Sequence, residues 1–277
     1  MKIYVLMENT SKHPDLVAEH GLSLLVEACG RRILFDTGAS SAFADNAAQM
    51  GVDLSTVDAC VLSHGHCDHG GGLLRFLQKN AHAPVLVSPH AFDVHYNAHG
   101  KDIGLSPALL RHERVCVVAE DVYPLFPGVV LHRAASMPAL YPAEGQGMEA
   151  VVNGVRVADD FRHEQYLLVE ERGMRVLISG CSHRGVLNIA SYFRPDVLVG
   201  GFHYMRCSTE ADSARLKQAA QVLLALPTRY YYTGHCTGAC AMGILQPQMG
   251  HRLHAFATGD VLRLSQEELS VHAVLRR

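Results

Sequence analysis

The chain has 277 residues, 48% of them hydrophobic and 18% charged, and its formal net charge at pH 7 is −3. This length and hydrophobic content are enough for a large buried core, and the charge gives no reason to expect nucleic-acid binding. No apolar run approaches the length of a membrane span, and the apolar run at residues 1–7 is too short for a signal peptide. We therefore expect a cytoplasmic protein that binds neither nucleic acid nor a membrane.

Apolar runs of strand length and helix length follow one another along the chain. Residues 211–226 carry alanine and leucine at helical spacing, and Pro227 ends that run. The predicted strands lie at residues 1–7, 22–27, 31–35, 57–62, 84–88, 115–118, 129–132, 151–157, 166–170, 174–179, 196–200, 229–233 and 261–264. The predicted helices lie near residues 40–50, 70–79, 185–193, 208–225 and 239–248. No Ser/Gly-rich linker or run of charges divides the sequence, so we expect one domain over residues 1–277.

The most informative motif is the run Ser63-His64-Gly65-His66-Cys67-Asp68-His69, which directly follows the apolar residues 57–62. In an extended segment, His64 and His66 point to the same side and can bind one cation. Asp68 and His69 follow where the chain turns, and a buried carboxylate among imidazoles would be costly without a partner. The spacing predicts a metal site with room for two ions side by side.

The segment at residues 90–141 is the hardest to assign to regular structure. It is rich in proline and glycine and also holds several aromatic residues. Loops on a rigid scaffold often set substrate choice, so we expect this segment to supply a lid. Its aromatic side chains either pack the loop onto the core or stack on a planar ring of the substrate.

Three further predicted strands end in histidine, namely His183, His203 and His235. Strand ends that converge on one edge are where open α/β folds place their sites, so we expect these histidines near the motif. Six other histidines lie in a stretch without ligand spacing, and most of them are interpreted as surface or loop residues: His82, His90, His95, His99, His112 and His132. Among them, His95 and His99 have the spacing of one helix face and could bind metal adventitiously.

The eight cysteines are expected to be reduced thiols, because several of them lie beside proposed ligands. Cys236 and Cys240 are four residues apart, which is helical spacing. They could pair, or hold a structural zinc ion, only if their geometry allowed it.

The motif resembles the signature of the metallo-β-lactamase superfamily of metal-dependent hydrolases. The run Arg32-Ile33-Leu34-Phe35-Asp36-Thr37-Gly38 resembles the strand and Asp-X-Gly loop that precede this signature. Other pieces resemble the branch similar to the dihydropterin methyl-ribofuranosylaminobenzene 5′-phosphate synthases. They are Glu19-His20-Gly21-Leu22-Ser23, Glu164-Gln165, Gly180-Cys181-Ser182-His183, Gly200-Gly201-Phe202-His203 and His235-Cys236-Thr237-Gly238. The resemblance implies an α/β (α+β) fold, a four-layer αββα sandwich with its site at one edge.

The resemblance also implies a set of metal ligands. The first metal would take His64, His66 and His183, and the second would take Asp68, His69 and His235. Many members place a bridging aspartate where this chain has Cys181, so two assignments follow. Either His183 supplies the third imidazole of the first site, which we favour, or Cys181 bridges as a thiolate and His163 supplies that imidazole.

The remaining implied roles concern catalysis and substrate binding. Asp36 would accept a hydrogen bond from a ligating histidine and orient it. His203 would donate a proton or contact the substrate, and His20 and Glu19 would line the mouth of the pocket. The predicted catalytic residues are thus Asp36, Asp68 and His203.

Five imidazoles and one carboxylate suit zinc first, with iron or manganese as alternatives. Two divalent cations with one anionic ligand and a bridging hydroxide keep a positive charge, which favours an anionic, phosphorylated small molecule as substrate. We expect a hydrolase or transferase in which metal-bound hydroxide acts as nucleophile or base. The alternatives are a β-lactam or thioester hydrolase, and a metal-binding sensor or ligand-binding protein without strong turnover.

Overall fold

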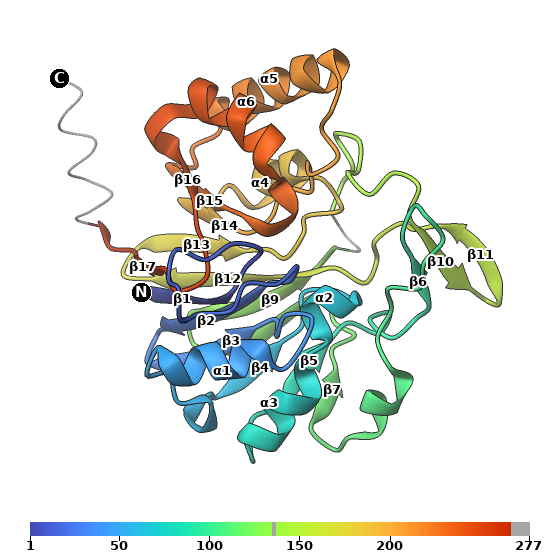
Figure 1. Cartoon of the computed structure of the whole chain (residues 1–277), viewed down its shortest axis with the longest axis vertical. Helices are drawn as coiled ribbons and strands as arrows, with labels where there is room; N and C mark the ends of the chain where they lie inside the picture. Colours follow the sequence, from blue (N-terminus) through green and yellow to red (C-terminus); the bar gives the residue numbers. More distant parts are fainter. Residues whose placement is uncertain (135–136, 267–277) are drawn as a thin grey trace.

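The computed structural model describes residues 1–134 and 137–266. Two seven-stranded sheets pack face to face, and helices cover their outer faces, which gives four layers in the order αββα (Figure 1). Because both faces of each sheet are covered, the central strands are short, fully buried runs that are mostly valine and leucine. The predicted fold class is confirmed.

The first sheet combines strands from the first half of the chain with one strand from much later. Its strands are β1 (Lys2–Met7), β2 (Ser23–Ala28), β3 (Arg31–Phe35), β4 (Ala59–Val61), β5 (Val85–Val87), β7 (Val115–Val117) and β17 (Val261–Arg263). They lie in the order β17-β1-β2-β3-β4-β5-β7. The pairs from β3 to β7 are parallel, so the carboxyl ends of these strands share one edge.

The second sheet mirrors this plan. Its strands are β8 (Val122–Phe126), β9 (Val129–Arg133), β12 (Gln165–Glu171), β13 (Met174–Ile178), β14 (Val197–Val199), β15 (Tyr230–Thr233) and β16 (Leu253–Ala255). They lie in the order β16-β15-β14-β13-β12-β9-β8. The pairs from β13 to β16 are parallel, and their carboxyl ends again share one edge.

Alternation along β12 shows how one strand serves two cores. Leu167 and Val169 belong to the apolar cluster between the two sheets. Tyr166 and Leu168 belong to the cluster between the second sheet and its helices. Successive side chains of a strand point to opposite faces, so this single run seals both sides of the sheet.

Helices close the outer faces of the sandwich (Figure 1). Those on the first sheet are α1 (Ala42–Gln49) and α3 (Leu73–Lys79), and those on the second are α4 (Val186–Phe193), α5 (Glu210–Ala225) and α6 (Ala239–Met249). The predicted helix at residues 208–225 is α5, which begins at a capping box formed by Thr209 and Asp212. A single-turn helix, α2 (Cys67–Gly70), lies inside the histidine motif.

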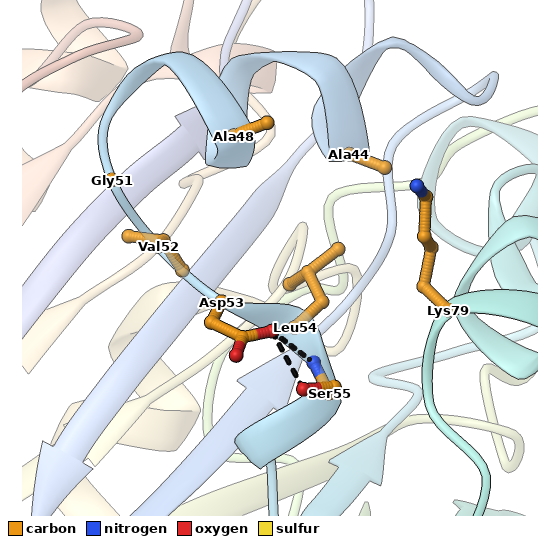
Figure 2. A pocket seen from close by; sticks show the side chains of 8 residues that line it. All are labelled: Ala44, Ala48, Gly51, Val52, Asp53, Leu54, Ser55 and Lys79. Carbon is orange, nitrogen blue, oxygen red and sulfur yellow. Dashed lines mark hydrogen bonds between the residues drawn. The ribbon is translucent and has the colours of Figure 1, made fainter.

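A hollow of about 320 Å³ lies on the outside of the first half, between α1, the short helix η1 (Leu54–Thr56) and α3 (Figure 2). Asp53 points toward Ser55 and accepts hydrogen bonds from its backbone N–H and its hydroxyl. None of the residues that line this hollow is a predicted ligand, so it lies apart from the candidate site.

The predicted strand at residues 151–157 is wrong, because a turn divides it. Two strands form a hairpin there, β10 (Glu149–Val152) and β11 (Val155–Ala158). Asn153 and Gly154 between them both have positive φ, which is the geometry of a two-residue Asn-Gly hairpin turn. With β6 (His95–Tyr96), the hairpin makes a third sheet that extends beyond the sandwich (Figure 1).

The expectation of a lid over residues 90–141 needs a similar correction. β7, β8 and β9 lie within this range and are strands of the two main sheets. The helix face expected for His95 and His99 is also wrong, since His95 lies in β6 and His99 in the turn that follows. A lid role remains a prediction for the other residues of the segment, of which 135–136 lie outside the described part.

No helix formed by residues 1–134 or 137–266 has both the length and the apolar character needed to cross a membrane. The assignment of residues 1–277 to one domain remains a prediction, and residues 267–277 lie outside the described part of the chain.

Candidate metal centre

The loops that follow the parallel strands bring the predicted ligands together. The histidine motif follows β4 in the first sheet, whereas His183 and His235 follow β13 and β15 in the second. Because each loop leaves the carboxyl end of its strand, the two sheets meet at one edge around a common centre. Three groups of metal-binding atoms form there, each with all its atoms within 4.8 Å of one another.

The first group contains His64, His66 and His183, all of them buried. The Nε2 atoms of His64 and His183 are 3.3 Å apart. Two nitrogens bound to one tetrahedral zinc ion at about 2.0–2.1 Å would be separated by about 3.3 Å. His66 Nε2 is buried without a hydrogen-bond partner among the described residues, as a site built for a further group would leave it. The first group therefore fits a metal ion.

The second group contains Asp68, His69, Cys181 and His235. His69 Nε2 lies 3.2 Å from His235 Nε2 and 3.1 Å from Cys181 Sγ. Asp68 Oδ2 lies 3.3 Å from His235 Nε2 and 3.8 Å from His69 Nε2. Imidazole, carboxylate and thiol atoms that converge in this way are a donor set suited to zinc.

Cys181 connects the two groups. It also forms a third group with His183 and His203, which places its sulfur on the first side of the centre as well. Burial and the neighbouring Cys236 thiol raise the pKa of Cys181 well above its usual value. A bound cation would deprotonate this thiol. Cys181 could then serve either donor group, while His183 stays with His64 and His66.

Asp36 and Ser63 orient two of the ligands. Asp36 is fully buried, and its Oδ2 accepts hydrogen bonds from His69 Nδ1 and from Ser63 Oγ, each at 2.6 Å. Ser63 Oγ in turn accepts from His64 Nδ1 at 2.7 Å. Both imidazoles therefore keep a proton on Nδ1 and turn Nε2 toward the centre, which is how the hydrogen-bond partner of a metal-binding histidine usually orients it. Asp36 was predicted to have this role, whereas Ser63 was not.

His235 is oriented by the first strand of the chain. Its Nδ1 donates to Asn9 Oδ1 at 2.8 Å, and its backbone N–H donates to Glu8 Oε1 at 2.6 Å. Glu8 and Asn9 follow β1, more than 220 residues before His235. Neither residue was predicted, because nothing in their local sequence pattern indicates a partner so far away in the chain.

The two groups differ in their charge preference. Burial and the neighbouring imidazoles lower the pKa values of His64, His66 and His183 well below the usual value. Burial also opposes charge on His69, but the carboxylates of Asp36 and Asp68 outweigh it and raise the pKa of His69 to about 9. At neutral pH the first group is ready to bind a cation, whereas His69 must first lose a proton.

A fourth buried cluster lies behind His66 and corrects the interpretation of His95 as a surface or loop residue. His95 is buried, and its Nδ1 donates to Asp159 Oδ2 at 3.0 Å. His163 Nε2 lies 3.3 Å from the same oxygen, while its Nδ1 accepts a hydrogen bond from Gly65 N–H at 3.0 Å. His163 thus groups with His66, His95 and Asp159 rather than with His64 and His183. Neither His95 nor Asp159 was predicted to belong to a site.

His203 lies between the first group and a cavity. Its ring centroid is 4.1 Å from that of His183, and its Nδ1 is buried without a hydrogen-bond partner in the described part of the chain. Gly201, two residues earlier, allows the Cys236 thiol to pack closely against this loop, because a Cβ there would lie 2.3 Å from Cys236 Sγ. The cavity has a volume of about 430 Å³ and is lined by Glu144, Gln146, His203, Tyr204, Arg206, Cys207, Asp212 and Arg215.

The two residues expected at the pocket mouth differ from each other. His20 is half exposed, and its Nε2 lies 3.4 Å from Asp68 Oδ2 at the second group. Glu19 accepts hydrogen bonds from the backbone N–H groups of Ala39 and Ser40 and from the Ser40 hydroxyl. Its carboxylate thus fastens the loop after Asp36, and its role in substrate binding remains a prediction.

The geometry does not allow Cys236 to pair with Cys240. Cys240 Sγ lies 2.6 Å from Cys207 Sγ instead. Cys236 turns toward the metal centre, where its Sγ lies 3.5 Å from the backbone oxygen of Cys181. Helical spacing alone could not reveal the partner, because Cys207 comes from a different loop.

Comparisons with known proteins identify the family and the fold of the chain. The sequence model of the family described as the metallo-beta-lactamase superfamily matches residues 16–235. The chain is 28% identical, over 95% of its own length and 96% of the relative's, to the 7,8-dihydropterin-6-methyl-4-(beta-D-ribofuranosyl)-aminobenzene-5′-phosphate synthase of Methanocaldococcus jannaschii. The crystal structure of Tm1679, a metal-dependent hydrolase of the beta-lactamase superfamily, superimposes with a TM-score of 0.82 and 29% identity, covering 96% of this chain and 99% of that one. Zinc-bound PqqB from Methylobacterium extorquens shares the fold, with a TM-score of 0.59 and 12% identity over 95% of this chain and all of that one.

Proposed function

The chain belongs to the metallo-beta-lactamase superfamily, and we propose that it is a metal-dependent enzyme that acts on an anionic, phosphorylated small molecule at a dinuclear centre. The observation that carries this proposal is the pair of adjacent donor groups, His64-His66-His183 and Asp68-His69-His235, with Cys181 between them. Each of His64, His69 and His235 has its Nδ1 engaged by a hydrogen-bond partner, and its Nε2 faces the other metal-binding atoms. Hydrogen bonds of this kind orient the other ring nitrogen toward a metal ion, which supports metal binding by this cluster.

Zinc is the proposed metal, with iron or manganese as alternatives, because imidazole-rich sites with a thiol and a single carboxylate suit it. When bound, such ions lower the pKa of a coordinated water and attract negative charge on the substrate. Asp68 is the proposed carboxylate ligand. His20, whose Nε2 faces the Asp68 carboxylate at 3.4 Å, is placed to hold that carboxylate in position.

The cavity beside His203 is the proposed substrate site. Arg206 on its wall is exposed and uses Nη1 for a bond to the backbone oxygen of Gln146, which leaves its other donors for an anion. Arg215 is paired with Glu144 at 2.6 Å, so Arg206 is the better candidate for binding phosphate. His203, between the cavity and His183, is placed to exchange a proton with the substrate.

The reaction is either hydrolysis of this substrate or its transfer to a second molecule with loss of pyrophosphate. The resemblance to the M. jannaschii synthase supports the transfer reaction and suggests a pterin-related substrate. The resemblance to Tm1679 supports hydrolysis. Arg206 and the cationic centre favour an anionic substrate over a β-lactam or thioester.

The test combines metal analysis with turnover. Purified, untagged protein is analysed for zinc, iron and manganese per chain and assayed on phosphate mono- and diesters and on a phosphorylated pterin. We expect about two metals per chain and turnover, and we expect His203→Gln to keep both metals but lose most turnover. Two metals without turnover of any of these substrates would instead support a sensor or ligand-binding protein, and fewer than two metals would contradict the dinuclear centre.

A further inference from the structure

Two thiols outside the metal centre lie unusually close together. Cys207 lies in the loop before α5 and is 8% exposed, whereas Cys240 is exposed in the first turn of α6. Their Sγ atoms are 2.6 Å apart. A disulfide bond is about 2.05 Å long, so the two atoms need to approach each other by only about half an ångström.

The backbones on both sides of these thiols are already fastened to each other. Met205 N–H donates to the backbone oxygen of Cys236 at 2.9 Å, and Phe202 N–H donates to Thr237 Oγ1 at 2.9 Å. A Cβ on Gly238 would lie 2.7 Å from Met205 Cα, which shows how closely the two loops pack. Bringing the two sulfur atoms together therefore requires little rearrangement of the backbone. The two loops are already ordered in the folded protein, so the new bond costs them little further conformational entropy.

We propose that Cys207 and Cys240 are a redox modification site that forms a reversible intramolecular disulfide by exchange with low-molecular-weight disulfides such as oxidised glutathione. The exposed Cys240 thiolate attacks the glutathione disulfide, forms a mixed disulfide and releases one glutathione thiolate. Cys207 then loses its proton and attacks Cys240 Sγ, which expels the second glutathione. In total, the disulfide bond of oxidised glutathione breaks, the Cys207–Cys240 disulfide forms, and two electrons pass from the protein thiols to glutathione.

The positions of the two residues support these roles. Cys240 is accessible to a soluble oxidant and lies at a helix N-terminus, where negative charge is favoured. Burial and the neighbouring Cys240 raise the pKa of Cys207 to about 11, so Cys207 is suited to the second, intramolecular step rather than to the first. The other thiols near the centre, Cys181 and Cys236, are fully enclosed.

The bond would join two segments that matter to the candidate site. Cys207 lines the cavity that His203 faces, and Cys240 follows the turn that carries His235. A disulfide would tie the cavity wall to α6 and remove freedom from the unfolded chain, so we expect the oxidised protein to melt at a temperature several degrees higher. This inference does not rest on the proposed function, since neither thiol belongs to either donor group.

The experiment uses the full-length, metal-loaded protein. The protein is equilibrated with mixtures of reduced and oxidised glutathione, alkylated to block free thiols, and digested with trypsin. The expected product joins the peptide of residues 207–215 to that of residues 230–252, and fragmentation must place the link on Cys240 rather than on Cys236. Dithiothreitol should abolish the product and restore two alkylated thiols.

Variants separate this site from general thiol oxidation. Cys207→Ser should stop at the mixed disulfide of Cys240 with glutathione, and Cys240→Ser should prevent both products. Cys116→Ser, which removes an exposed thiol in β7 of the other sheet, should behave as wild type. A link on Cys236, a mixed disulfide alone in the wild-type protein, or an unchanged melting temperature after complete oxidation would each overturn the proposal.

Discussion

Replacing Asp36 with Asn tests how far the metal centre depends on its buried carboxylate. Asp36 accepts three hydrogen bonds at 2.6 Å, from His69 Nδ1, Ser63 Oγ and Ser63 N–H. The amide of Asn has one acceptor oxygen and one donor nitrogen, so at least one of these donors would face an N–H group. If the nitrogen takes the Oδ2 position, His69 and Ser63 Oγ both lose their acceptor.

The expected effect follows from these contacts. Loss of a partner that orients a metal ligand typically lowers metal affinity about 10–100-fold, or about 1.4–2.7 kcal/mol of binding free energy. The second metal should weaken most, because His69 contacts Asp36 directly. The first metal should weaken less, because His64 reaches Asp36 only through Ser63.

The assay is a zinc titration of metal-free protein against a chromophoric chelator, with circular dichroism to show that Asp36→Asn remains folded. Asp58→Asn is the matched control, because Asp58 accepts from Arg32 N–H near the other end of β3 and is not in either donor group. Wild-type affinity for both metals in folded Asp36→Asn would refute the assignment of Asp36 as the orienting carboxylate.

Four further predictions concern the ligands, pH, substrate and core. Folded His183→Ala should lose about one metal per chain, whereas His163→Ala should keep both, and elemental analysis measures each. Loss of a metal from His163→Ala but not from His183→Ala would favour the Cys181–His163 assignment. The carboxylates of Asp36 and Asp68 raise the pKa of His69 to about 9, so zinc binding at the second site should release a proton at pH 7. The zinc affinity of that site should rise about tenfold per pH unit up to about pH 9. Isothermal titration in buffers of different ionisation enthalpy measures the proton release, and its absence would contradict the prediction. Arg206→Gln should raise KM for a phosphorylated substrate about 10-fold or more with little change in kcat, and steady-state kinetics showing an unchanged KM would remove Arg206 from the substrate site. Leu167→Ala, in the core between the sheets, should reduce the free energy of unfolding by about 2–5 kcal/mol in urea denaturation. A loss below about 1 kcal/mol would show that neighbouring side chains move in to fill the cavity that the substitution leaves.

Much of the fold could be predicted because buried strands leave a simple local signal. The apolar runs that became β3, β4 and β13 stand out in the sequence and end in the motifs of the site. Short strands such as β8, which contains a proline, and β16 carry little signal of their own and depend on their neighbours. The hairpin at residues 149–158 was predicted as one strand because its Asn-Gly turn was overlooked.

The candidate site divides in the same way. His64, His66, Asp68 and His69 lie within six residues, so local spacing was sufficient to predict them. Ser63 lay inside the quoted motif, and its role could have been suspected from the need to orient His64. Asn9, His95 and Asp159 lie on loops whose approach to the centre depends on the packing of the two sheets, which sequence spacing does not encode.

The paired donor groups also bear on how the protein holds together. His64 and His183 are 119 residues apart in the chain, and His69 and His235 are 166 apart. A metal bound by such ligands would join positions that are far apart in the chain. Bringing them together costs an unfolded chain conformational entropy, whereas the folded protein already holds them together. With free metal at about 1,000 times the dissociation constant, this linkage stabilises the folded protein by about 4 kcal/mol per site. Removal of bound metal would therefore lower the stability of the folded protein as well as its proposed activity.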